Sequence, residues 1–347
     1  MIAHVRLTVL MARPPVFVLL ASYAAVGLAQ GGRANASVSL AEICAAIAGF
    51  LIFSVACNDL ADEAIDRVNL PGDRRRPLVG GGARRSQLCT TGVTGAVAAL
   101  AASLAVDWRA ALVVAVGLAL SAAYSLRPVR VADRGVLAPL LLPACYVAVP
   151  YLLGLDAAHA PVTGADLVLL AGLYLGFVGR ILLKDFRDVR GDALFGKRTF
   201  LVRHGRRATC TLSMLCWAAG VVVIMISLAH SAPLPQFDDL LLGALASFAV
   251  LCIAVLAGST DHRRDERLIS TVSILGRGAM LVILATLSLT DRGYRVFVTL
   301  PVLDLLTLLV FAQALRMLRH GPVQRRIDLS PLALAEPELS GSTAPRP

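Results

Sequence analysis

The chain has 347 residues, of which 57% are hydrophobic and only 16% are charged, and its mean hydropathy is +0.74. A soluble domain rarely combines so much apolar content with so few charges, so the composition argues against a soluble enzyme or binding module. The formal net charge of +10 would suggest nucleic-acid binding in a soluble protein, but here we expect it to serve anionic lipid and an anionic substrate, with no nucleic-acid partner.

The apolar residues form long blocks, and a bilayer core requires helices of about 20 apolar residues. The segment AALVVAVGLALSAAY at 110–124 is apolar on nearly all sides and contains neither charge nor proline. The pattern predicts an all-α, polytopic transmembrane bundle embedded in a lipid bilayer. In chain order, the ten expected spans are 15–30, 38–57, 88–106, 110–126, 135–155, 165–183, 208–229, 238–258, 269–290 and 296–318.

Lysine and arginine are distributed unequally between alternate connections of these spans. One set, which includes both termini and the long connections 58–87 and 184–207, carries most of them. The other set contains only Arg33, Arg109, Arg292 and Arg295. Because cytoplasmic connections carry the excess of positive charge, we predict ten spans with both termini in the cytoplasm; nine spans are the alternative. We expect residues 1–320 to form the membrane domain and 329–347 to be a disordered tail.

The first acidic motif, NDLADEAID at 58–66, directly follows the second predicted span. If the helix continues through it, Asp59, Asp62 and Asp66 stand at i, i+3 and i+7 and share one face. Asn58, Asp62 and Asp66 lie on nearly the same face. The motif therefore places several oxygen-bearing side chains together at one helix end.

The second acidic motif, DFRDVRGD at 185–192, directly follows the sixth predicted span. Asp185, Asp188 and Asp192 repeat the i, i+3, i+7 spacing of the first motif. Because the second and sixth spans are four apart in the chain, both motifs leave the bilayer on the same side. Two acidic faces that are distant in sequence can therefore converge.

Clustered carboxylates at a membrane boundary repel one another unless some are protonated or a cation binds them. Mg²⁺ prefers oxygen ligands and commonly binds one or two carboxylates together with substrate phosphate. Two acidic faces, each holding a metal, would clamp a diphosphate and neutralise it as it leaves. Two solvated acidic loop ends are the alternative, and a calcium-binding EF-hand is excluded because its glycine and terminal Glu positions are absent.

Basic residues surround both motifs, and a diphosphate requires such cations. They are Arg67, Arg74, Arg75 and Arg76 after the first motif, and Lys184, Lys197 and Arg198 around the second. Topology alone would also place arginines in these connections. We therefore single out Arg13 and Lys184, which sit at helix ends beside the expected site.

These stretches resemble the signatures of the UbiA-type intramembrane prenyltransferase superfamily. NDLADEAIDRVNLPGDRRRPLVGG resembles its NDxxDxxxD motif followed by R-P-L, and LKDFRDVRGDALFGKRTFLVRHG resembles its DxxDxxxD motif followed by G-K-R-T. YSLRPVR at 124–130 resembles the YS-x-x-P-x-R connection, and Arg13-Pro14 resembles the Arg-Pro start of the first helix. The resemblance extends over roughly residues 12 to 290.

The resemblance implies nine helices around a central cavity with a cytoplasmic cap, and Mg²⁺-dependent transfer of a prenyl group from a polyprenyl diphosphate. By matching position, it implies that the metal ligands are Asn58, Asp62, Asp66, Asp188 and Asp192, and that the four aspartates among them are the catalytic residues. It gives Asp59 and Asp185 a supporting role, and it makes Arg13, Arg130 and Lys184 contacts of the diphosphate or the acceptor. The sequence departs from the family near Gly80 and Asp133, which affects the acceptor rather than the metals.

The expected reaction is ionisation of the allylic diphosphate inside an apolar cavity that excludes water, followed by attack of a small-molecule acceptor, aromatic in the first instance. Aromatic residues that could line the cavity and stabilise positive charge are Tyr124, Tyr146, Tyr151, Tyr174 and Phe177. A lipid or sugar phosphate acceptor and a membrane terpene cyclase remain alternatives. A cation-coupled transporter is a further one, although transporter acids usually lie at mid-membrane.

Overall fold

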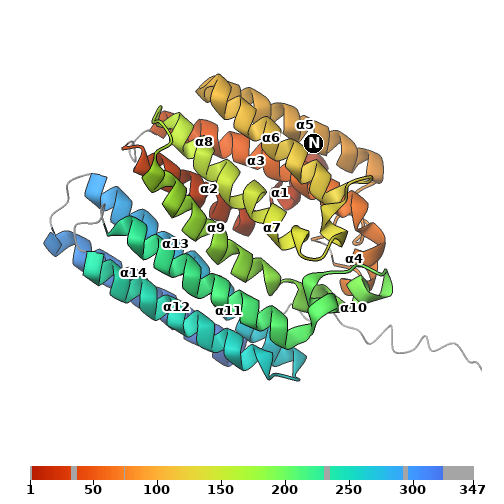
Figure 1. Cartoon of the computed structure of the whole chain (residues 1–347). Coiled ribbons are helices and arrows are strands. Elements are labelled where there is room, and N and C mark those ends of the chain that lie inside the picture. Colours follow the sequence, from red (N-terminus) through yellow and green to blue (C-terminus); the bar gives the residue numbers. More distant parts are fainter. Residues whose placement is uncertain (1, 33–36, 74, 230–234, 292–295, 323–347) are drawn as a thin grey trace, which may run out of the picture.

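The computed structural model describes residues 2–32, 37–73, 75–229, 235–291 and 296–322. Within this part of the chain every regular element is a helix. The helices lie side by side in one bundle, with α5 (Arg85–Val106) and α6 (Trp108–Ser125) along one edge and α12 (Pro235–Ala257) and α14 (Val296–His320) along the opposite edge (Figure 1). The predicted all-α membrane bundle is confirmed.

The helices of the described residues include nine that are long and apolar enough to cross a membrane, and one bent pair that would make a tenth span. The bent pair is α1 (Ile2–Met11) and α2 (Pro14–Gln30), which meet at 58°. Arg13 stands at the bend in the left-handed region, with φ 42°, and the two prolines that follow cannot continue the preceding helix. The bend turns Arg13 toward the end of the neighbouring helix α3 (Ser37–Ala61).

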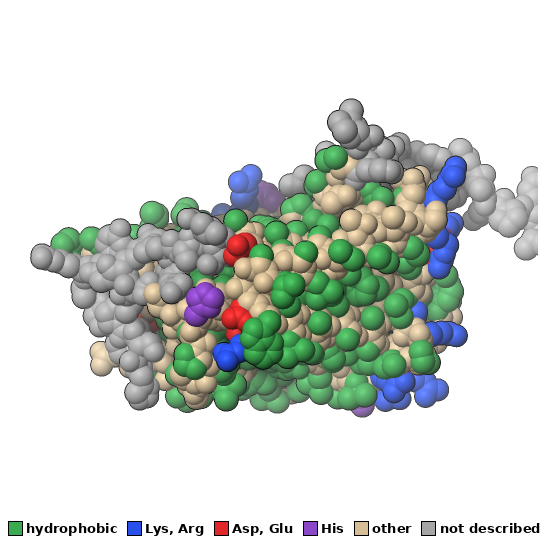
Figure 2. Space-filling model, turned by 90° about the horizontal axis from the view of Figure 1, so that it is seen from above, with side chains coloured by type: hydrophobic (Ala, Val, Ile, Leu, Met, Phe, Trp, Pro, Cys, Tyr) green, Lys and Arg blue, Asp and Glu red, His purple; other side chains and the backbone are tan. Residues whose placement is uncertain are grey.

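Hydrophobic side chains cover the flank of the bundle seen in Figure 2, and Lys and Arg side chains gather at its right-hand end. Large exposed apolar residues occur along the outer helices, for example Val97 and Leu104 on α5, Leu251 on α12 and Leu308 on α14. Water would solvate such a surface poorly, whereas lipid chains would cover it. The surface therefore agrees with the membrane assignment.

One span is assembled from three short pieces: α7 (Leu137–Pro143), the π-helical turn η2 (Ala144–Ala148) and α8 (Val149–Ala157). Pro143 lies inside this span and Pro150 follows the turn, and proline removes a helical hydrogen bond and crowds the preceding turn. The wider π turn fits this interruption. It lies next to the cavity described below.

Glycine allows two helices to pack backbone against backbone where α9 (Gly164–Leu182) meets α11 (Phe200–Leu228). A β carbon on Gly220 would lie 2.8 Å from the backbone nitrogen of Gly176, and one on Gly172 would lie 2.9 Å from the carbonyl oxygen of Gly220. No side chain fits at either position, so small residues set this close approach. The contact fixes the position of α9, and the second acidic motif follows the end of this helix.

The buried apolar residues form two large clusters. One is built mainly from α9, α11, α12 and α13 (His262–Asp291), and the other from α2, α3, α6 and α8. Tyr146 packs against both clusters, with its ring edge-on to Phe50 at 6.4 Å and to Phe177 at 6.3 Å between centroids. The cavity opens beside this ring, between the two halves of the bundle.

Several sequence predictions fall on residues that the structure does not describe. These are the tail 329–347 and the charged residues Arg33, Arg74, Arg292 and Arg295. The 1–320 domain boundary and the cytoplasmic cap stay predictions. The short helices α4 (Glu63–Asn69) and α10 (Asp185–Leu194) lie together at one end of the bundle (Figure 1).

Candidate functional site

The first acidic motif spans a bend between α3 and α4. Asn58 and Asp59 belong to the last turn of α3, Asp62 stands at the bend, and Asp66 lies on α4. Backbone hydrogen bonds from Asp62 N to Asn58 O (2.9 Å) and from Asp66 N to Asp62 O (2.8 Å) carry the helical path through the bend. The three aspartates are only 3%, 7% and 8% exposed, so the predicted acidic face is buried.

The second acidic motif occupies one short helix. α9 ends at Leu182 and α10 begins at Asp185, so Asp185, Asp188 and Asp192 follow one another along α10. The predicted spacing thus lies on a separate helix rather than on a continuation of the span. Arg187 of the same helix donates from Nη2 to Ser270 Oγ of α13 at 2.9 Å, which ties α10 to the bundle.

The two motifs converge, as their order in the chain predicted. Lys197 lies between them, with Nζ 3.8 Å from Asp62 Oδ2 and 3.5 Å from Asp192 Oδ1. Asn69, at the end of α4, donates to the carbonyl of Asp188 at 3.1 Å and accepts from the N–H of Gly191 at 2.6 Å. Asn69 was missed by the sequence analysis, because nothing in its local sequence indicates a partner more than a hundred residues away.

Two arginines hold the buried carboxylate of Asp59. Arg13 Nη2 lies 2.8 Å from Asp59 Oδ1, and Arg76 binds the same oxygen. Arg76 also lies 3.4 Å from Asp66 Oδ2 and from Asn58 Oδ1. Of the arginines that the sequence analysis named after the first motif, Arg76 reaches these carboxylates and Arg67 does not. The place of Arg76 in the R-P-L segment was the signal that could have singled it out.

Arg130 and Lys184 also reach the acidic motifs. Arg130 precedes the short turn η1 (Val131–Asp133), and its Nη2 lies 2.7 Å from Asp62 Oδ1 while Nε lies 2.6 Å from Asp133 Oδ2. Lys184 Nζ is 4.0 Å from Asp188 Oδ2. Both residues thus lie beside the acidic motifs.

Two expected contacts do not reach the buried aspartates of the motifs. Arg67 pairs with Glu63 at 2.7 Å, and its side chain is 60% exposed. Arg198 is exposed, and within the described residues it forms no ion pair with either motif. The structure thus separates these arginines from those that point inward, and neither belongs to the candidate site.

Burial sets the protonation of the site residues outside the spans. Burial raises the pKa of Asp66 to about 6; Arg76 opposes the rise, and Asp59 and Asp62 add to it. Burial also raises the pKa of Asp192, with Lys197 opposing. For Lys197, burial lowers the pKa, but Asp62 and Asp192 outweigh that effect and leave it raised. The carboxylates are thus crowded enough to favour binding of further positive charge.

The donor set suits a hard divalent cation. Asp59 Oδ2 and Asp192 Oδ1 are buried without a hydrogen-bond partner. No three His, Cys, Asp or Glu side chains of the described residues are grouped as a complete metal site. A site that offers one or two carboxylates from each motif, and leaves the remaining positions to phosphate oxygens, is the kind Mg²⁺ uses. The residues therefore fit a metal that binds together with a phosphorylated ligand.

A cavity of about 190 Å³ lies beside the acidic motifs. Its polar end is lined by Arg13, Asn58 and Lys184, and Tyr124, Tyr146 and Phe177 form part of its wall. Two expected wall residues lie elsewhere: Tyr151 is fully buried and donates to Asp166 at 2.9 Å, and Tyr174 donates to the carbonyl of Leu140.

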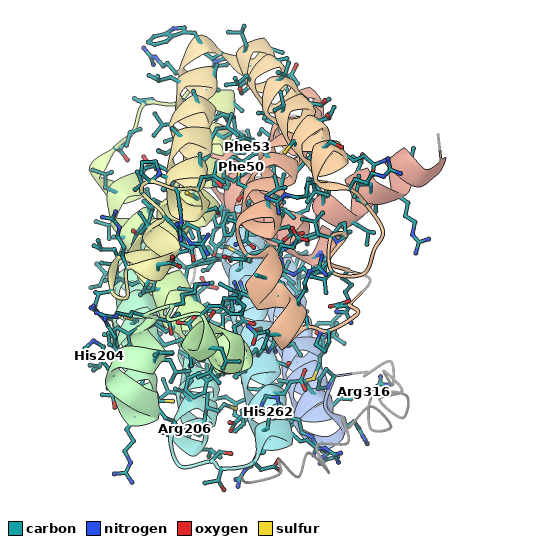
Figure 3. The ribbon with its side chains drawn as sticks, turned by 90° about the vertical axis from the view of Figure 1, so that its right-hand side faces the viewer. Phe50, Phe53, His204, Arg206, His262 and Arg316 are labelled. Carbon is teal, nitrogen blue, oxygen red and sulfur yellow. The ribbon has the colours of Figure 1, made fainter. Side chains whose placement is uncertain are left out.

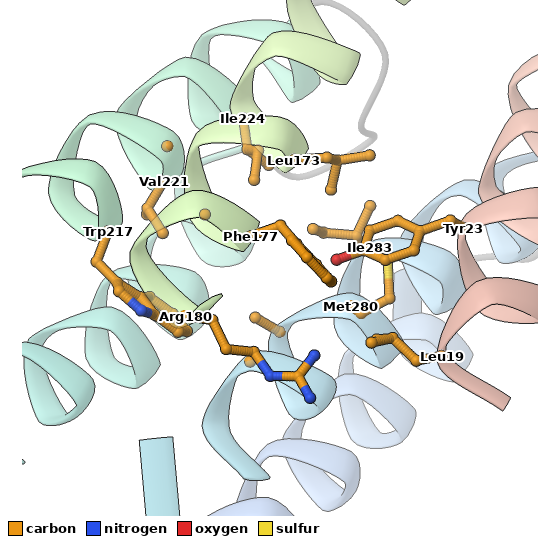
Figure 4. A pocket seen from close by; sticks show the side chains of 14 residues that line it. Leu19, Tyr23, Leu173, Phe177, Arg180, Trp217, Val221, Ile224, Met280 and Ile283 are labelled. Atoms are coloured by element: carbon orange, nitrogen blue, oxygen red, sulfur yellow. The ribbon is translucent and has the colours of Figure 1, made fainter. Parts of the chain in front are cut away.

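A smaller and almost wholly apolar chamber of about 50 Å³ adjoins this cavity (Figure 4). Tyr23, Leu173, Ile224 and Met280 are among its lining residues, and Leu19, Phe177 and Arg180 border both spaces. The site therefore has an ionic end at the motifs and an apolar depth inside the bundle.

Arg206 of α11 also contacts α10. Its guanidinium lies 4.8 Å from the centroid of the Phe186 ring, and it forms an ion pair with Asp265 of α13 at 2.6 Å. It also donates to the carbonyl of Leu256 at 2.9 Å. Arg206 and His262 lie at the same end of the bundle (Figure 3). These contacts hold the helix that carries the second motif.

The chain matches the model of the UbiA prenyltransferase family over residues 18–275. It is similar to the 34 kDa chain of bacteriochlorophyll synthase from Chloroflexus aurantiacus, with 30% identity over 173 residues, which are 50% of this chain and 54% of that one. The match thus spans about half of that relative. It is also 28% identical over 265 residues to digeranylgeranylglyceryl phosphate synthase from Methanopyrus kandleri, covering 73% of this chain and 90% of the relative.

Solved structures share the fold. A UbiA homolog from Archaeoglobus fulgidus bound to GPP and Mg²⁺ aligns with a TM-score of 0.64 at 17% identity, over 81% of this chain and 99% of that one. The apo structure of a UbiA homolog from Aeropyrum pernix K1 aligns with a TM-score of 0.61 at 19% identity, over 80% and 98% of the two chains. At these identities the likeness concerns the fold alone.

Proposed function

The chain belongs to the UbiA prenyltransferase family, and we propose that it transfers a prenyl group from a prenyl diphosphate to an electron-rich acceptor, in a Mg²⁺-dependent reaction. The observation that carries the proposal is the position of Lys197, within 4 Å of both Asp62 and Asp192. The two acidic motifs thereby face one space, and a cavity with an apolar depth begins beside them.

The basic side chains of the site bind the diphosphate in this proposal. They are Arg13, Arg76, Arg130, Lys184 and Lys197, each of which lies against a motif carboxylate. Arginine and lysine form charge-assisted hydrogen bonds with phosphate oxygens. We expect these side chains to exchange some of their carboxylate contacts for the diphosphate when the donor binds.

The carboxylates take the metal in the same proposal. Asn58, Asp62 and Asp66 from the first motif and Asp188 and Asp192 from the second would be ligands, with Asp59 and Asp185 orienting them or bound water. Bound Mg²⁺ would neutralise the charge that develops on the leaving diphosphate. The Archaeoglobus fulgidus homolog bound to GPP and Mg²⁺ supports this choice of donor and metal.

The cavity holds the prenyl chain and excludes water from the reacting carbon. Leu19, Phe177 and the apolar chamber behind them offer the hydrocarbon a continuous path away from the motifs. Tyr146 is fixed by a 3.1 Å hydrogen bond to Ser54, so its ring keeps its orientation beside the cavity. Rings of this kind stabilise an allylic cation through their faces.

The acceptor is an aromatic ring in our first proposal, since loss of a proton after attack would restore aromaticity. A lipid phosphate is the second candidate, favoured by the long match to digeranylgeranylglyceryl phosphate synthase. A terpene cyclase, in which the substrate itself is attacked, is the third. Family membership favours group transfer over the cation-coupled transporter.

We also propose that the site faces the cytoplasm. The arginine-rich connections of the sequence leave the bundle at the end that carries α4 and α10 (Figures 1 and 2). The positive-inside rule assigns such an end to the cytoplasmic side. Labelling of Cys89, which is exposed near the start of α5, by a membrane-impermeant thiol reagent in oriented vesicles tests the orientation.

The proposed function is tested by incubating the purified protein with Mg²⁺, prenyl diphosphates of several chain lengths and panels of aromatic acids and lipid phosphates. Mass spectrometry then identifies the products. A prenylated acceptor and stoichiometric diphosphate release are expected, and a cyclised hydrocarbon or alcohol would indicate the cyclase. Absence of diphosphate release with every donor would contradict the proposal.

A further inference from the structure

Arg180 lies in the wall of the cavity and has no carboxylate partner. It belongs to α9, five residues before Asp185, which places it a little over one helical turn deeper in the bundle. It borders both the 190 Å³ cavity and the 50 Å³ chamber. Figure 4 shows its side chain reaching toward the same space as Leu19 and Met280. Among the described residues, no acid forms an ion pair with it and no hydrogen bond satisfies its guanidinium.

Besides the Tyr23 hydroxyl of the same chamber, the ionisable groups that act on Arg180 are two cations. They are Arg187, which lines the same cavity, and Arg277 on α13. Arg277, too, forms no ion pair within the part of the chain that the structure describes. The face of the Phe177 ring also lies close to Arg180, 5.7 Å from the guanidinium carbon. Unpaired positive charge inside a membrane bundle is costly and marks a functional site more often than a structural one.

The diphosphate has no need of Arg180. Its end of the cavity already holds the basic side chains named above, and each of them pairs with a carboxylate of the two motifs. Arg180 instead faces the apolar part, where the prenyl chain and the allylic cation would lie. A bare guanidinium there would repel the developing carbocation, because like charges in a low-dielectric cavity interact strongly. A negatively charged group bound next to Arg180 would remove this repulsion between the guanidinium and the carbocation.

We propose that Arg180, together with Arg187, binds an anionic group of the acceptor, a carboxylate or a phosphate. The proposal rests on the proposed prenyl transfer and deepens it, because it names the chemical class of the second substrate. The planar guanidinium of Arg180 offers paired donors that match either anion. Bound there, the anion neutralises Arg180 and holds the acceptor next to the prenyl chain. A neutral acceptor leaves the guanidinium uncompensated, so the site selects against it.

Trp217 provides a reporter for this site. The chain has two tryptophans; Trp217 lines the chamber beside Arg180, whereas Trp108 is 65% exposed at the start of α6. In a Trp108→Phe background the emission of Trp217 can be followed alone. The probes are two matched pairs that do not absorb at the excitation wavelength: cyclohexanecarboxylate with cyclohexanecarboxamide, and hexyl phosphate with hexanol. Each is titrated with and without Mg²⁺ and the unreactive donor analogue geranyl thiolodiphosphate.

With the donor analogue bound, at least one anion is expected to change Trp217 emission saturably and to bind about tenfold or more tightly than its neutral match. Arg180→Gln is expected to abolish that preference, and Arg180→Lys to retain part of it. Arg264→Gln, in the first turn of α13, is the matched control and should leave the preference unchanged.

Three results would overturn the proposal: no anion preferred over its neutral match, a preference that survives in Arg180→Gln, or a preference that vanishes once the donor analogue is bound. The last result would assign Arg180 to the diphosphate. Mg²⁺-dependent binding of the donor analogue is measured on every variant, and its retention shows that the variant is folded. Failure of the parent protein to bind the analogue would contradict the proposed function, whereas loss of anion preference alone contradicts only the role of Arg180.

Discussion

Asn69 and Gly191 join the two acidic motifs. The Asn69 Oδ1 accepts the Gly191 N–H at 2.6 Å, and a β carbon on Gly191 would lie 2.6 Å from the Asn69 amide. The helices α4 and α10 therefore approach each other as closely as they do because residue 191 has no side chain. The distance between the two carboxylate groups depends on this contact.

Gly191→Ala is expected to push α4 away from α10. We predict at least about a tenfold loss of turnover, because small displacements of reacting groups are costly. We also predict a lower melting temperature, because overpacking costs about 1–3 kcal/mol. Turnover and thermal unfolding in detergent are the measurements. Gly164→Ala, whose β carbon meets nothing within 4 Å, is the control. Recovery of stability in the Asn69→Ala, Gly191→Ala double variant would identify the clash, and its absence would contradict it.

Arg76 and Arg67 are a matched pair of arginines in the same connection. Arg76 reaches Asp59 and Asp66, whereas Arg67 pairs with Glu63 at the surface. Arg76→Gln should reduce kcat/KM for the prenyl diphosphate by about a hundredfold, because a donor aimed at the leaving group is lost. Arg67→Gln should have little effect, since exposed ion pairs contribute about 0–1 kcal/mol. Equal losses in both variants would show that the arginines act only through the charge of the connection.

The carboxylates of both motifs should be required for metal-dependent turnover. Asp62→Ala and Asp188→Ala are each expected to lower turnover by about a thousandfold or more, with wild-type-like melting curves. Removal of divalent metal by EDTA should lower the turnover of the parent protein to a similar extent. Added Mg²⁺ should then restore turnover in the parent protein but not in the two variants. The assay measures release of labelled diphosphate in membranes. Mg²⁺-independent, wild-type-like turnover by either variant would contradict the metal assignment.

The apolar chamber should limit the length of the prenyl chain. Gly176 lines it, and a β carbon on Gly176 would meet no atom within 4 Å. Gly176→Val therefore adds side-chain bulk to the chamber wall at a position where a β carbon has room. We predict that the variant still uses a C10 diphosphate but loses at least about tenfold in kcat/KM for a C20 diphosphate, because overfilled cavities reject bulk.

Gly258→Val is the matched control for the chain-length prediction, since residue 258 is equally open but lies outside the cavity. It should leave the ratio of the two donors unchanged. An equal loss for both donors in Gly176→Val would place the prenyl chain elsewhere.

Much of this fold follows from the sequence, because the signals are local. Apolar blocks gave the spans, and counting the spans between residues 58 and 185 placed both motifs at one end of the bundle. What the sequence did not reveal depends on distant contacts. Asn69 contacts α10, which follows more than a hundred residues later, and Arg76 reaches Asp59 only because the connection after α4 folds back toward the end of α3.

The aromatic residues also show that side-chain placement depends on contacts beyond the local sequence. Of the five expected in the cavity wall, Tyr151 turns away to Asp166 and Tyr174 turns away to Leu140. Composition identified the residue type, but which rings face the cavity depends on how each helix packs against its neighbours.

Arg13, Arg76, Arg130, Lys184 and Lys197 each lie against a motif carboxylate, which leaves this end of the site close to electrical balance. A metal ion that arrives alone adds positive charge to arginines already in place, and a diphosphate that arrives alone adds negative charge to the aspartates. A diphosphate that brings its Mg²⁺ ions changes the local charge least. We therefore expect loading to be synergistic: each ligand would raise the affinity for the other, and the pair would enter as a nearly neutral unit.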